Sequence, residues 1–250
     1  MRPGVAMRLD GIEIKVTIGA DQVGAARDEW LPGGEGDRRA IWFLEQRPAA
    51  AGPVTLPLLD AGVILRLRQN QDDEDDSTVK LRPCERSWLS DRWLEAEKGD
   101  DWKFTVEQDW VGDRHVLAAS LVAEQGEGEI AALRDHGRPA RALFSSEQER
   151  YLADCAPVAV DLDALRLLGP VDALRWKRVK VGPHEVVAEQ WQVGDLLFLE
   201  LSIRVDGPDE AEALRAQRDF ERRIRERGFD LAARETKTRT VLEYLASREP

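Results

Sequence analysis

Alternating apolar and polar residues predict β-strands along much of the chain. In the stretch LDGIEIKVTI at residues 9–18, Ile12 and Ile14 share one face of a strand, whereas Glu13 and Lys15 share the other. This period of two is the spacing of side chains on a pleated strand. The same alternation predicts strands over residues 38–46, 63–70, 77–83, 102–111, 114–121, 174–181, 185–191 and 196–205. We therefore expect a β-rich protein.

Helical spacing of apolar residues interrupts these strands. Residues 20–30 place Val23, Ala26 and Trp30 on one side of a short amphipathic helix. Further helices are predicted over residues 86–101, 161–168 and 208–228 and in the stretch ETKTRTVLEYL near the end of the chain. Residues 126–160 are irregular, and we interpret them as a connecting insertion that could cover one mouth of a barrel.

Two rows of cations lie in the stretch 63–82. Arg66 and Arg68 share one face of its first strand, and Lys80 and Arg82 share one face of its second. If the two strands pair as a hairpin, these four cations converge on one surface of the sheet. Such a surface repels itself unless water floods it or an anion binds to it. The hairpin therefore gives the first indication of an anion-binding site.

Two other predicted strands also carry charged faces. Glu107 and Asp109 share a face, and their mutual repulsion is unfavourable unless a metal ion or a cation neutralises it. In LRWKRVKV at residues 174–181, Arg175 and Lys177 share one face and a second basic pair occupies the other. Only one of these basic pairs can face inward, and the alternation alone leaves the choice open.

The acidic loop between the two strands of the hairpin, QDDEDD, has some features of a calcium site. It lacks the glycine at the sixth position and the terminal glutamate of an EF-hand loop. We therefore predict that residues 72–76 form a solvated hairpin turn.

Composition and charge narrow the class of protein. Hydrophobic residues make up 42% and charged residues 34% of the 250 residues, as is typical of a soluble globular protein. No apolar run approaches the ~20 residues that a membrane span needs, and the N-terminus lacks the apolar core of a signal peptide, so we expect a cytoplasmic protein with no membrane partner. The net charge of −12 argues against a nucleic-acid partner. Cys84 and Cys155 are predicted to be reduced structural thiols.

Short charged motifs follow one another in a defined order along the predicted strands and the last helix. They are Gly11-Ile12-Glu13-Ile14-Lys15, Leu65-Arg66-Leu67-Arg68, Thr78-Val79-Lys80, Glu107-Gln108-Asp109, Lys177-Arg178, the strand around Glu200, and Thr236-Lys237 with Arg239 beside it. This order resembles the CYTH superfamily, the triphosphate tunnel metalloenzymes, which include inorganic triphosphatases, thiamine triphosphatases and class IV adenylyl cyclases. The resemblance covers nearly the whole chain.

The resemblance implies an α+β fold in which an eight-stranded antiparallel closed β-barrel surrounds a water-filled tunnel and the helices pack outside. Residues 1–250 would form a single tunnel domain, with an insertion around 126–160 and C-terminal helices in 208–247. Inward cations would bind the phosphates of a small-molecule triphosphate, namely Lys15, Arg66, Arg68, Lys80, Arg82, Lys177, Arg178, Lys237 and Arg239. The resemblance assigns catalytic roles to Lys15, Arg66, Arg68 and Lys80.

The resemblance also implies a metal site for Mg²⁺ or Mn²⁺, ions that prefer oxygen ligands and suit phosphate chemistry. Its ligands would be Glu13, Glu200, Glu107 and Asp109, the first two as direct ligands and the last two as supporting acids. The chain departs from the motif at Gly11, where the family has a glutamate. We therefore expect intact phosphate binding and weakened metal binding, with the ion bound mostly together with the substrate.

Two smaller departures bear on the same site. Trp191 stands two residues after Glu189, where the family has an acid. Asp10 precedes Gly11 by one residue, so it would point to the wrong face of its strand unless a bulge intervenes. Neither residue is expected to replace the missing glutamate.

The motifs favour a metal-dependent phosphohydrolase that acts on inorganic triphosphate or an organic triphosphate. Two alternatives stay open, a non-catalytic binder of triphosphate or polyphosphate with a degenerate metal site, and a class IV adenylyl cyclase. Phosphate release with divalent metal, anion binding without turnover, and pyrophosphate release from ATP distinguish the three. The tunnel cations contact phosphates, so the motifs leave the organic part of the substrate and the oligomeric state open.

Overall fold

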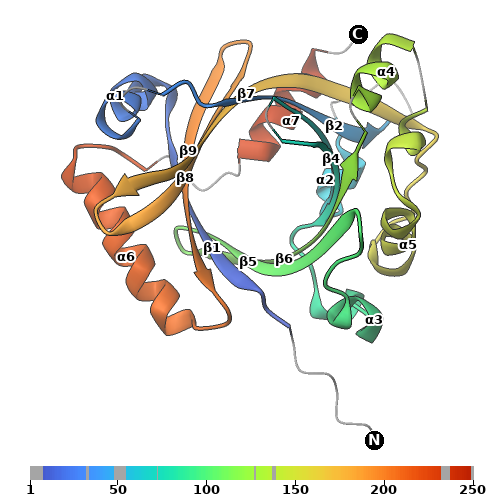
Figure 1. Ribbon diagram of the computed structural model, residues 1–250, viewed down its shortest axis with the longest axis horizontal. Helices are drawn as coiled ribbons and strands as arrows, with labels where there is room; N and C mark the ends of the chain where they lie inside the picture. Colours follow the sequence, from blue (N-terminus) through green and yellow to red (C-terminus); the bar gives the residue numbers. More distant parts are fainter. Residues whose placement is uncertain are drawn as a thin grey trace, which may run out of the picture.

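The chain forms a closed β-barrel with helices on its outside (Figure 1). The computed structural model describes residues 8–31, 34–47, 55–71, 73–126, 128–136, 139–231 and 237–248. The strands are β1 Gly11–Ile18, β2 Asp37–Gln46, β3 Val63–Asn70, β4 Asp75–Leu81, β5 Trp102–Val111, β6 Arg114–Gln125, β7 Leu165–Val181, β8 His184–Val193 and β9 Leu196–Asp206. Around the barrel they follow the order β1-β5-β6-β4-β3-β2-β7-β8-β9.

The helices connect these strands or follow them. The α-helices are α1 Ala20–Trp30, α2 Pro57–Asp60, α3 Asp91–Glu95, α4 Glu129–His136, α5 Ser146–Cys155, α6 Glu210–Glu226 and α7 Lys237–Ser247, and the short 3₁₀ helices are η1 Arg86–Trp88 and η2 Ala140–Leu143. None of the helices in the described ranges is long and apolar enough to cross a membrane.

The strand count corrects the expected fold in one respect. The α+β class and the closed barrel with outer helices are confirmed, but the described chain forms nine strands, not eight, and β1 pairs with β5 in parallel. Strand directions can alternate all the way around a closed ring only if the number of strands is even, so a nine-stranded barrel needs a parallel pair. Each strand overlaps a stretch of predicted alternation, although β7 begins well before its predicted start at residue 174, whereas the number eight came from the family resemblance.

Two helix predictions were wrong in whole or in part. Residues 165–168 begin strand β7, where Leu165 and Leu167 pair with Gln46 and Leu44 of β2. Apolar residues at helical spacing can equally line a strand that is buried on both faces, and here the β ladder prevails. Within residues 86–101, only η1 and α3 are helical, and the residues after α3 lead directly to β5.

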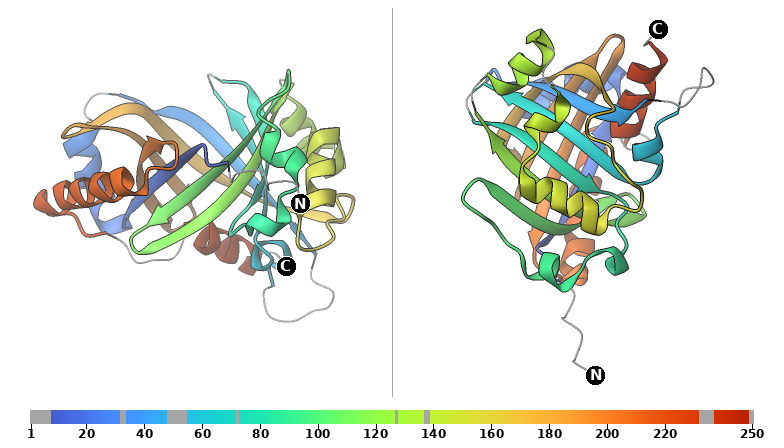
Figure 2. Two further views of the ribbon diagram at one scale, coloured as in Figure 1. Left: turned by 90° about the horizontal axis from the view of Figure 1, so that it is seen from below. Right: turned by 90° about the vertical axis from the view of Figure 1, so that its right-hand side faces the viewer.

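The inner and outer faces of the barrel follow the sequence alternation. On β1, Ile12 and Ile14 are fully buried in the outer layer that packs against α1 and α6, while Glu13 and Lys15 face the lumen. A second outer cluster lies beneath α3 and α5, which cover the opposite side of the barrel (Figure 2). The helices therefore bury the apolar outer face and leave the charged face inside.

The insertion at residues 126–160 covers the wall of the barrel and not a mouth. The side chain of Gln148 on α5 donates to the carbonyl oxygens of Ser77 on β4 and Leu121 on β6, at 3.0 and 3.2 Å. Tyr151 on the same helix donates to the carbonyl oxygen of Ala119 at 3.1 Å. These contacts fix α5 flat against β4 and β6, so the prediction that the insertion covers a mouth was wrong.

One end of the barrel interior is closed in part by α7. Val241 and Leu242 of this helix belong to the same apolar cluster as Phe43, Ile64 and Trp191, which face the lumen. Because α7 begins at Lys237, this packing carries a lysine into the interior at the first turn of the helix. Figure 1 shows α7 beside the opening of the barrel.

Candidate functional site

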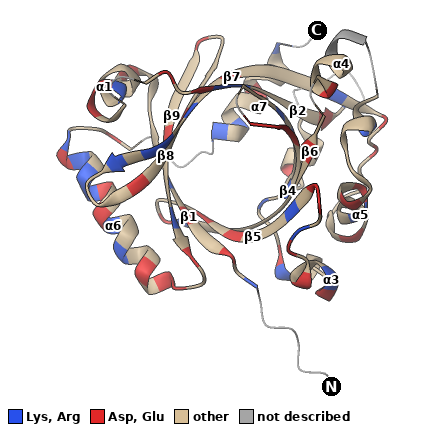
Figure 3. Ribbon diagram, viewed as in Figure 1, with Lys and Arg blue, Asp and Glu red and all other residues tan. Residues whose placement is uncertain are grey.

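A cavity of about 280 Å³ occupies the barrel interior, and charged side chains from most strands line it. Lys15, Arg66, Arg68 and Lys80 all line this one cavity, as their common phase on the strands predicts. Figure 3 shows acidic and basic positions along the strands around the lumen. The net charge of −12 thus coexists with a locally basic interior. That these four residues bind phosphate stays a prediction.

Asp109 is the most heavily paired acid of the interior. Its carboxylate lies 3.2 Å from Lys15 Nζ, 3.0 Å from Lys80 Nζ and 3.1 Å from Arg82 Nη1. Burial alone would raise the pKa of Asp109, but these cations outweigh it and hold the pKa well below its ordinary value. Asp109 therefore stays ionised. It holds Lys15 of β1 close to Lys80 and Arg82, which lie at the end of β4.

Lys15 bridges two acids. Its ammonium lies 2.8 Å from a carboxylate oxygen of Glu13 and 3.2 Å from Asp109. Burial alone would lower the pKa of Lys15, but Asp109 and Glu13 together raise it well above its ordinary value. Lys15 is therefore a firmly protonated cation whose charge is already shared between two carboxylates.

Glu107 is engaged by a residue that the sequence motifs do not single out. Arg204 of β9 forms an ion pair with Glu107 and also contacts Asp206 at 3.0 Å and the carbonyl oxygen of Asp10 at 2.9 Å. Its guanidinium lies directly over Gly11, since a Cβ atom built on Gly11 would stand 2.8 Å from Arg204 Nη2. The space that a side chain at this position would occupy therefore holds an arginine.

The predicted metal ligands divide into two groups. Carboxylate oxygens of Glu13, Glu107 and Asp109 lie within 4.8 Å of one another, which suits a divalent ion with oxygen ligands. Glu200 is not part of this group, because it pairs with Lys237 at 2.9 Å. The donor set thus fits a small hard cation, but each of its three acids already has a cationic partner.

Asp10 stays outside the metal group, as its phase predicts. Its carboxylate accepts hydrogen bonds from the backbone N–H of Val106 at 2.8 Å and from Arg8 Nε at 2.7 Å. It does not replace the carboxylate that is missing at Gly11.

A second charged cluster lies where α7 meets the barrel. Lys237 Nζ is 2.8 Å from Glu189 and 2.9 Å from Glu200, and it sits 4.1 Å from the ring centre of Trp191. Burial alone would raise the pKa of Glu189, but Lys237 and the arginines of β3 lower it strongly. The other half of the predicted Thr236-Lys237 motif, Thr236, lies outside the described residues.

Arg66 is poorly compensated by its neighbours in the part of the interior that the structure describes. Its one hydrogen bond within the described structure goes to Thr78 Oγ1 at 3.3 Å, and its Nε is buried without a partner. Burial, and then repulsion by Arg68, lowers the pKa of Arg66 to about 10. Arg68, by contrast, pairs with Asp76 at 2.9 Å. Arg66 therefore presents donors that an anion could satisfy.

The sequence interpretation missed one lumen arginine, Arg39, and left a second one, Arg175, open. Arg39 of β2 lines the cavity, and its side chain is only 4% exposed. Arg175 of β7 also lines the cavity, but its predicted companion Lys177 does not, because the strand changes register after Trp176. The signal for Arg39 was its common phase with Ile41 and Phe43, but both faces of β2 are apolar, so phase alone does not say which one faces the lumen.

Of the remaining predicted cations, Arg82 alone lines the central cavity in the part of the chain that the structure describes, and the other three lie farther out. Arg82 lines the central cavity, whereas Lys177 and Arg178 lie at a surface opening next to it. Arg178 has a φ of +61° at a bulge in β7, which turns its side chain out of the strand alternation. Arg239 pairs with Asp60 at 3.0 Å and does not line the central cavity.

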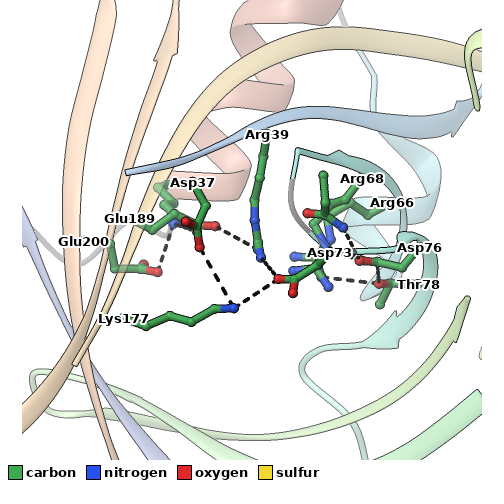
Figure 4. Close-up of polar contacts among 12 residues, drawn as sticks. Asp37, Arg39, Arg66, Arg68, Asp73, Asp76, Thr78, Lys177, Glu189 and Glu200 are labelled. Atoms are coloured by element: carbon green, nitrogen blue, oxygen red, sulfur yellow. Dashed lines mark hydrogen bonds and ion pairs between the residues drawn. The ribbon is translucent and has the colours of Figure 1, made fainter. Parts of the chain in front are cut away.

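The acidic loop differs from the predicted solvated turn. Strand β4 begins at Asp75, and both Asp75 and Asp76 are buried, at 7% and 8% exposure. Asp73 reaches across to Lys177 at 3.0 Å (Figure 4), and Asp72 lies outside the described residues. The prediction holds for Asp73 and Glu74, which are exposed in the connection between β3 and β4. It is wrong for Asp75 and Asp76, because β4 extends further than the apolar alternation indicates and Arg68 pairs with Asp76. Cys84 and Cys155 are both free and buried.

Comparisons with known proteins identify the fold and nothing more specific. No protein-family model and no curated protein matches the sequence. A candidate adenylate cyclase from Bacillus halodurans matches with a TM-score of 0.58 and 12% identity over 94% of this chain and 98% of the other. A candidate adenylyl cyclase from Hippeastrum, described as having a dominant triphosphatase activity, matches with a TM-score of 0.56 and 16% identity over 92% and 94% of the two chains. The chain therefore has the barrel fold of these two structures over almost its whole length, in agreement with the fold that the motifs imply.

Proposed function

We propose that this protein is a metal-dependent phosphohydrolase that binds a linear triphosphate in the barrel interior. The observation that carries the proposal is Arg66, a half-buried arginine whose Nε is buried without a partner and which lines a charged cavity of about 280 Å³. An uncompensated buried cation costs free energy, and binding of an anion recovers it. The fold shared with a protein described as having a dominant triphosphatase activity supports the same class of substrate.

The roles of the residues follow from their partners. Arg66, Arg68 and Lys80 would bind phosphate oxygens, and arginines suit this role because their planar donor sets match phosphoryl groups. Lys15 would hold a phosphoryl group next to the acids and stabilise charge that develops there during transfer. Lys237, the first residue of α7, would contact the other end of the substrate. It already bridges Glu189 and Glu200.

Glu13, Glu107 and Asp109 would hold Mg²⁺ or Mn²⁺. Such an ion neutralises phosphoryl charge and orients water for attack. Because cations already pair with all three acids, we expect the protein alone to bind the ion weakly and the triphosphate to supply further ligands. The chain's own contribution is to keep these carboxylates ionised and close together.

A non-catalytic binder remains the second candidate, and a specific observation favours it. The ion pair between Arg204 and Glu107, together with Gly11, leaves fewer free carboxylate oxygens than a metal-dependent hydrolase would use. A nucleotide cyclase is the third candidate and is supported only by the description of structures with the same fold.

The test is an activity panel with inorganic triphosphate, thiamine triphosphate and ATP, each with Mg²⁺ or Mn²⁺ and with chelator. The proposal expects metal-dependent release of orthophosphate, lost in Lys15→Met and Arg66→Met. Tight binding of triphosphate without turnover would identify a binder, and release of pyrophosphate from ATP would identify a cyclase.

A further inference from the structure

A group of cations lies at one mouth of the tunnel, beyond Arg66 and Arg68, and one of them, Lys177, is among the residues predicted to bind phosphate. Arg39 comes from β2, and Arg175 and Lys177 come from β7, which pairs with β2. Asp73, from the connection between β3 and β4, reaches into this group (Figure 4). Its carboxylate oxygen lies 3.0 Å from Lys177 Nζ and 3.5 Å from Arg39 Nη2. We refer to Arg39, Arg175 and Lys177 as the mouth cations.

Two of the mouth cations, Arg39 and Arg175, are poorly satisfied by the protein itself, whereas Lys177 pairs with Asp73 at 3.0 Å and with Asp37 at 3.9 Å. Arg39 is 4% exposed in its side chain, yet its Nε has no hydrogen-bond partner and its nearest carboxylates are 3.5 and 4.0 Å away, on Asp73 and Glu189. Burial, with repulsion from Arg175 and Arg68, lowers the pKa of Arg39. Arg175 makes no ion pair with any residue in the described ranges. A buried guanidinium with unused donors favours an anion with several acceptor oxygens.

Asp73 is a weak occupant of this position. Its side chain is 50% exposed, and an exposed carboxylate gains little from an ion pair because water competes with it. It also offers a single oxygen to both Arg39 and Lys177, whereas a phosphoryl group presents several oxygens. An incoming phosphoryl group could therefore displace the Asp73 side chain.

The position of the mouth cations connects them with the central cavity. Arg39 and Arg175 line the same cavity as Arg66 and Arg68. Across β2 and β3, Ile41 pairs with Arg68, so Arg39 lies two residues, or roughly 7 Å, farther along the strand toward the mouth. A ligand that extends beyond the deeper cations therefore meets Arg39 next.

We propose that the mouth cations form an additional phosphate subsite, so that the preferred ligand is a linear polyphosphate longer than triphosphate. This inference rests on the proposed function, because the deeper cations must hold the first phosphates of the chain. In the free protein the carboxylate of Asp73 takes the place of the additional phosphoryl group, and a longer chain displaces it.

Calorimetric titration without metal, using linear triphosphate and linear pentaphosphate at the same ionic strength, tests the subsite. A pentaphosphate offers about three overlapping triphosphate segments, so binding statistics alone favour it by about threefold. We expect a preference of tenfold or more in the wild type. Arg39→Gln and Arg175→Gln should reduce the preference to the statistical value. Lys180→Gln is the control: it removes an equal charge from β7 at an exposed residue that pairs with Glu185. This variant should keep the wild-type preference for pentaphosphate over triphosphate.

Asp73→Asn gives an independent result of opposite sign. Without the competing carboxylate, the affinity for pentaphosphate should rise several-fold more than the affinity for triphosphate. The same preference in the wild type, Arg39→Gln and Arg175→Gln would overturn the subsite, as would an unchanged preference in Asp73→Asn. Chain-length preference without metal-dependent hydrolysis would refute the hydrolase and keep the subsite, whereas hydrolysis without such a preference would do the reverse.

Discussion

Replacing Arg66 with methionine should stabilise the folded protein while it weakens binding of triphosphate. The methionine keeps most of the length of the side chain and removes a charge that the folded state accommodates poorly. Burial, and then Arg68, lowers the pKa of Arg66 well below its ordinary value, to about 10. Because the folded pKa is the lower one, the charged form of Arg66 destabilises the fold at every pH below about 10, and this penalty fades only above that value.

The size of the gain follows from the shift. Each unit of pKa corresponds to about 1.4 kcal/mol, so the shift sets an upper limit of roughly 3 kcal/mol. Arg66 retains partial access to water, which screens its charge, so we expect a gain of roughly 1–2 kcal/mol in the free energy of unfolding. For a chain of this length, that gain raises the melting temperature by roughly 2–8 °C.

Binding should change in the opposite direction. A hydrogen bond to a charged group contributes roughly 1.5–3 kcal/mol, so Arg66→Met should weaken the affinity for triphosphate by roughly 10- to 150-fold. The assays are thermal unfolding without ligand at pH 7.5 and calorimetric titration with triphosphate.

Lys15→Met is the matched control, since it removes one cation from the same cavity. Lys15 is paired with Glu13 and Asp109, so its loss leaves buried acids short of a partner and should destabilise the fold by about 3 kcal/mol. Both variants should bind triphosphate weakly, but their melting temperatures should move in opposite directions. A fall in the melting temperature of Arg66→Met equal to that of Lys15→Met would refute the reasoning.

Three further predictions concern the acids of the tunnel. Asp109→Asn leaves three neighbouring cations without their shared acid, so urea unfolding should show a loss of about 3–5 kcal/mol. Glu189 has a pKa below its ordinary 4.5, so the stability difference between wild type and Glu189→Gln should be full above pH 4.5 and shrink as the pH falls, as acid titration of the melting temperature would reveal. Arg204→Gln releases Glu107 and should tighten Mn²⁺ binding, measured by calorimetry without substrate; unchanged affinity would argue against the Glu107 site.

Much of the barrel follows from the period of two along the strands. Where one face is apolar and the other charged, as on β1, the alternation separates the two faces, and helices cover the apolar one. It puts Lys15 and Glu13 on the charged face, and the resemblance to tunnel proteins implies that this face is the lumen. The same argument placed Arg66 and Lys80 in one cavity.

The alternation is less informative on β2 and β7. On β2, Ile41 and Phe43 face the lumen while Trp42 and Leu44 lie in the outer cluster, so hydrophobicity does not distinguish the two faces and Arg39 was overlooked. On β7, a bulge at Arg178 changes the phase within the strand. A bulge depends on the partner strand, which a single stretch of sequence does not contain.

The effect of glycine at position 11 depends on the residue that occupies the space next to it. The sequence alone shows a missing carboxylate and predicts a weaker metal site. The structure shows that Arg204, 193 positions later in the chain, fills the space above Gly11 and neutralises Glu107. A carboxylate restored at Gly11 would first have to displace this guanidinium, because a Cβ atom alone would stand 2.8 Å from it. The departure is therefore a rearrangement in which the half-exposed side chain of Arg204 takes a place beside the acids, and the charge left for a divalent ion depends on Arg204 as much as on Gly11.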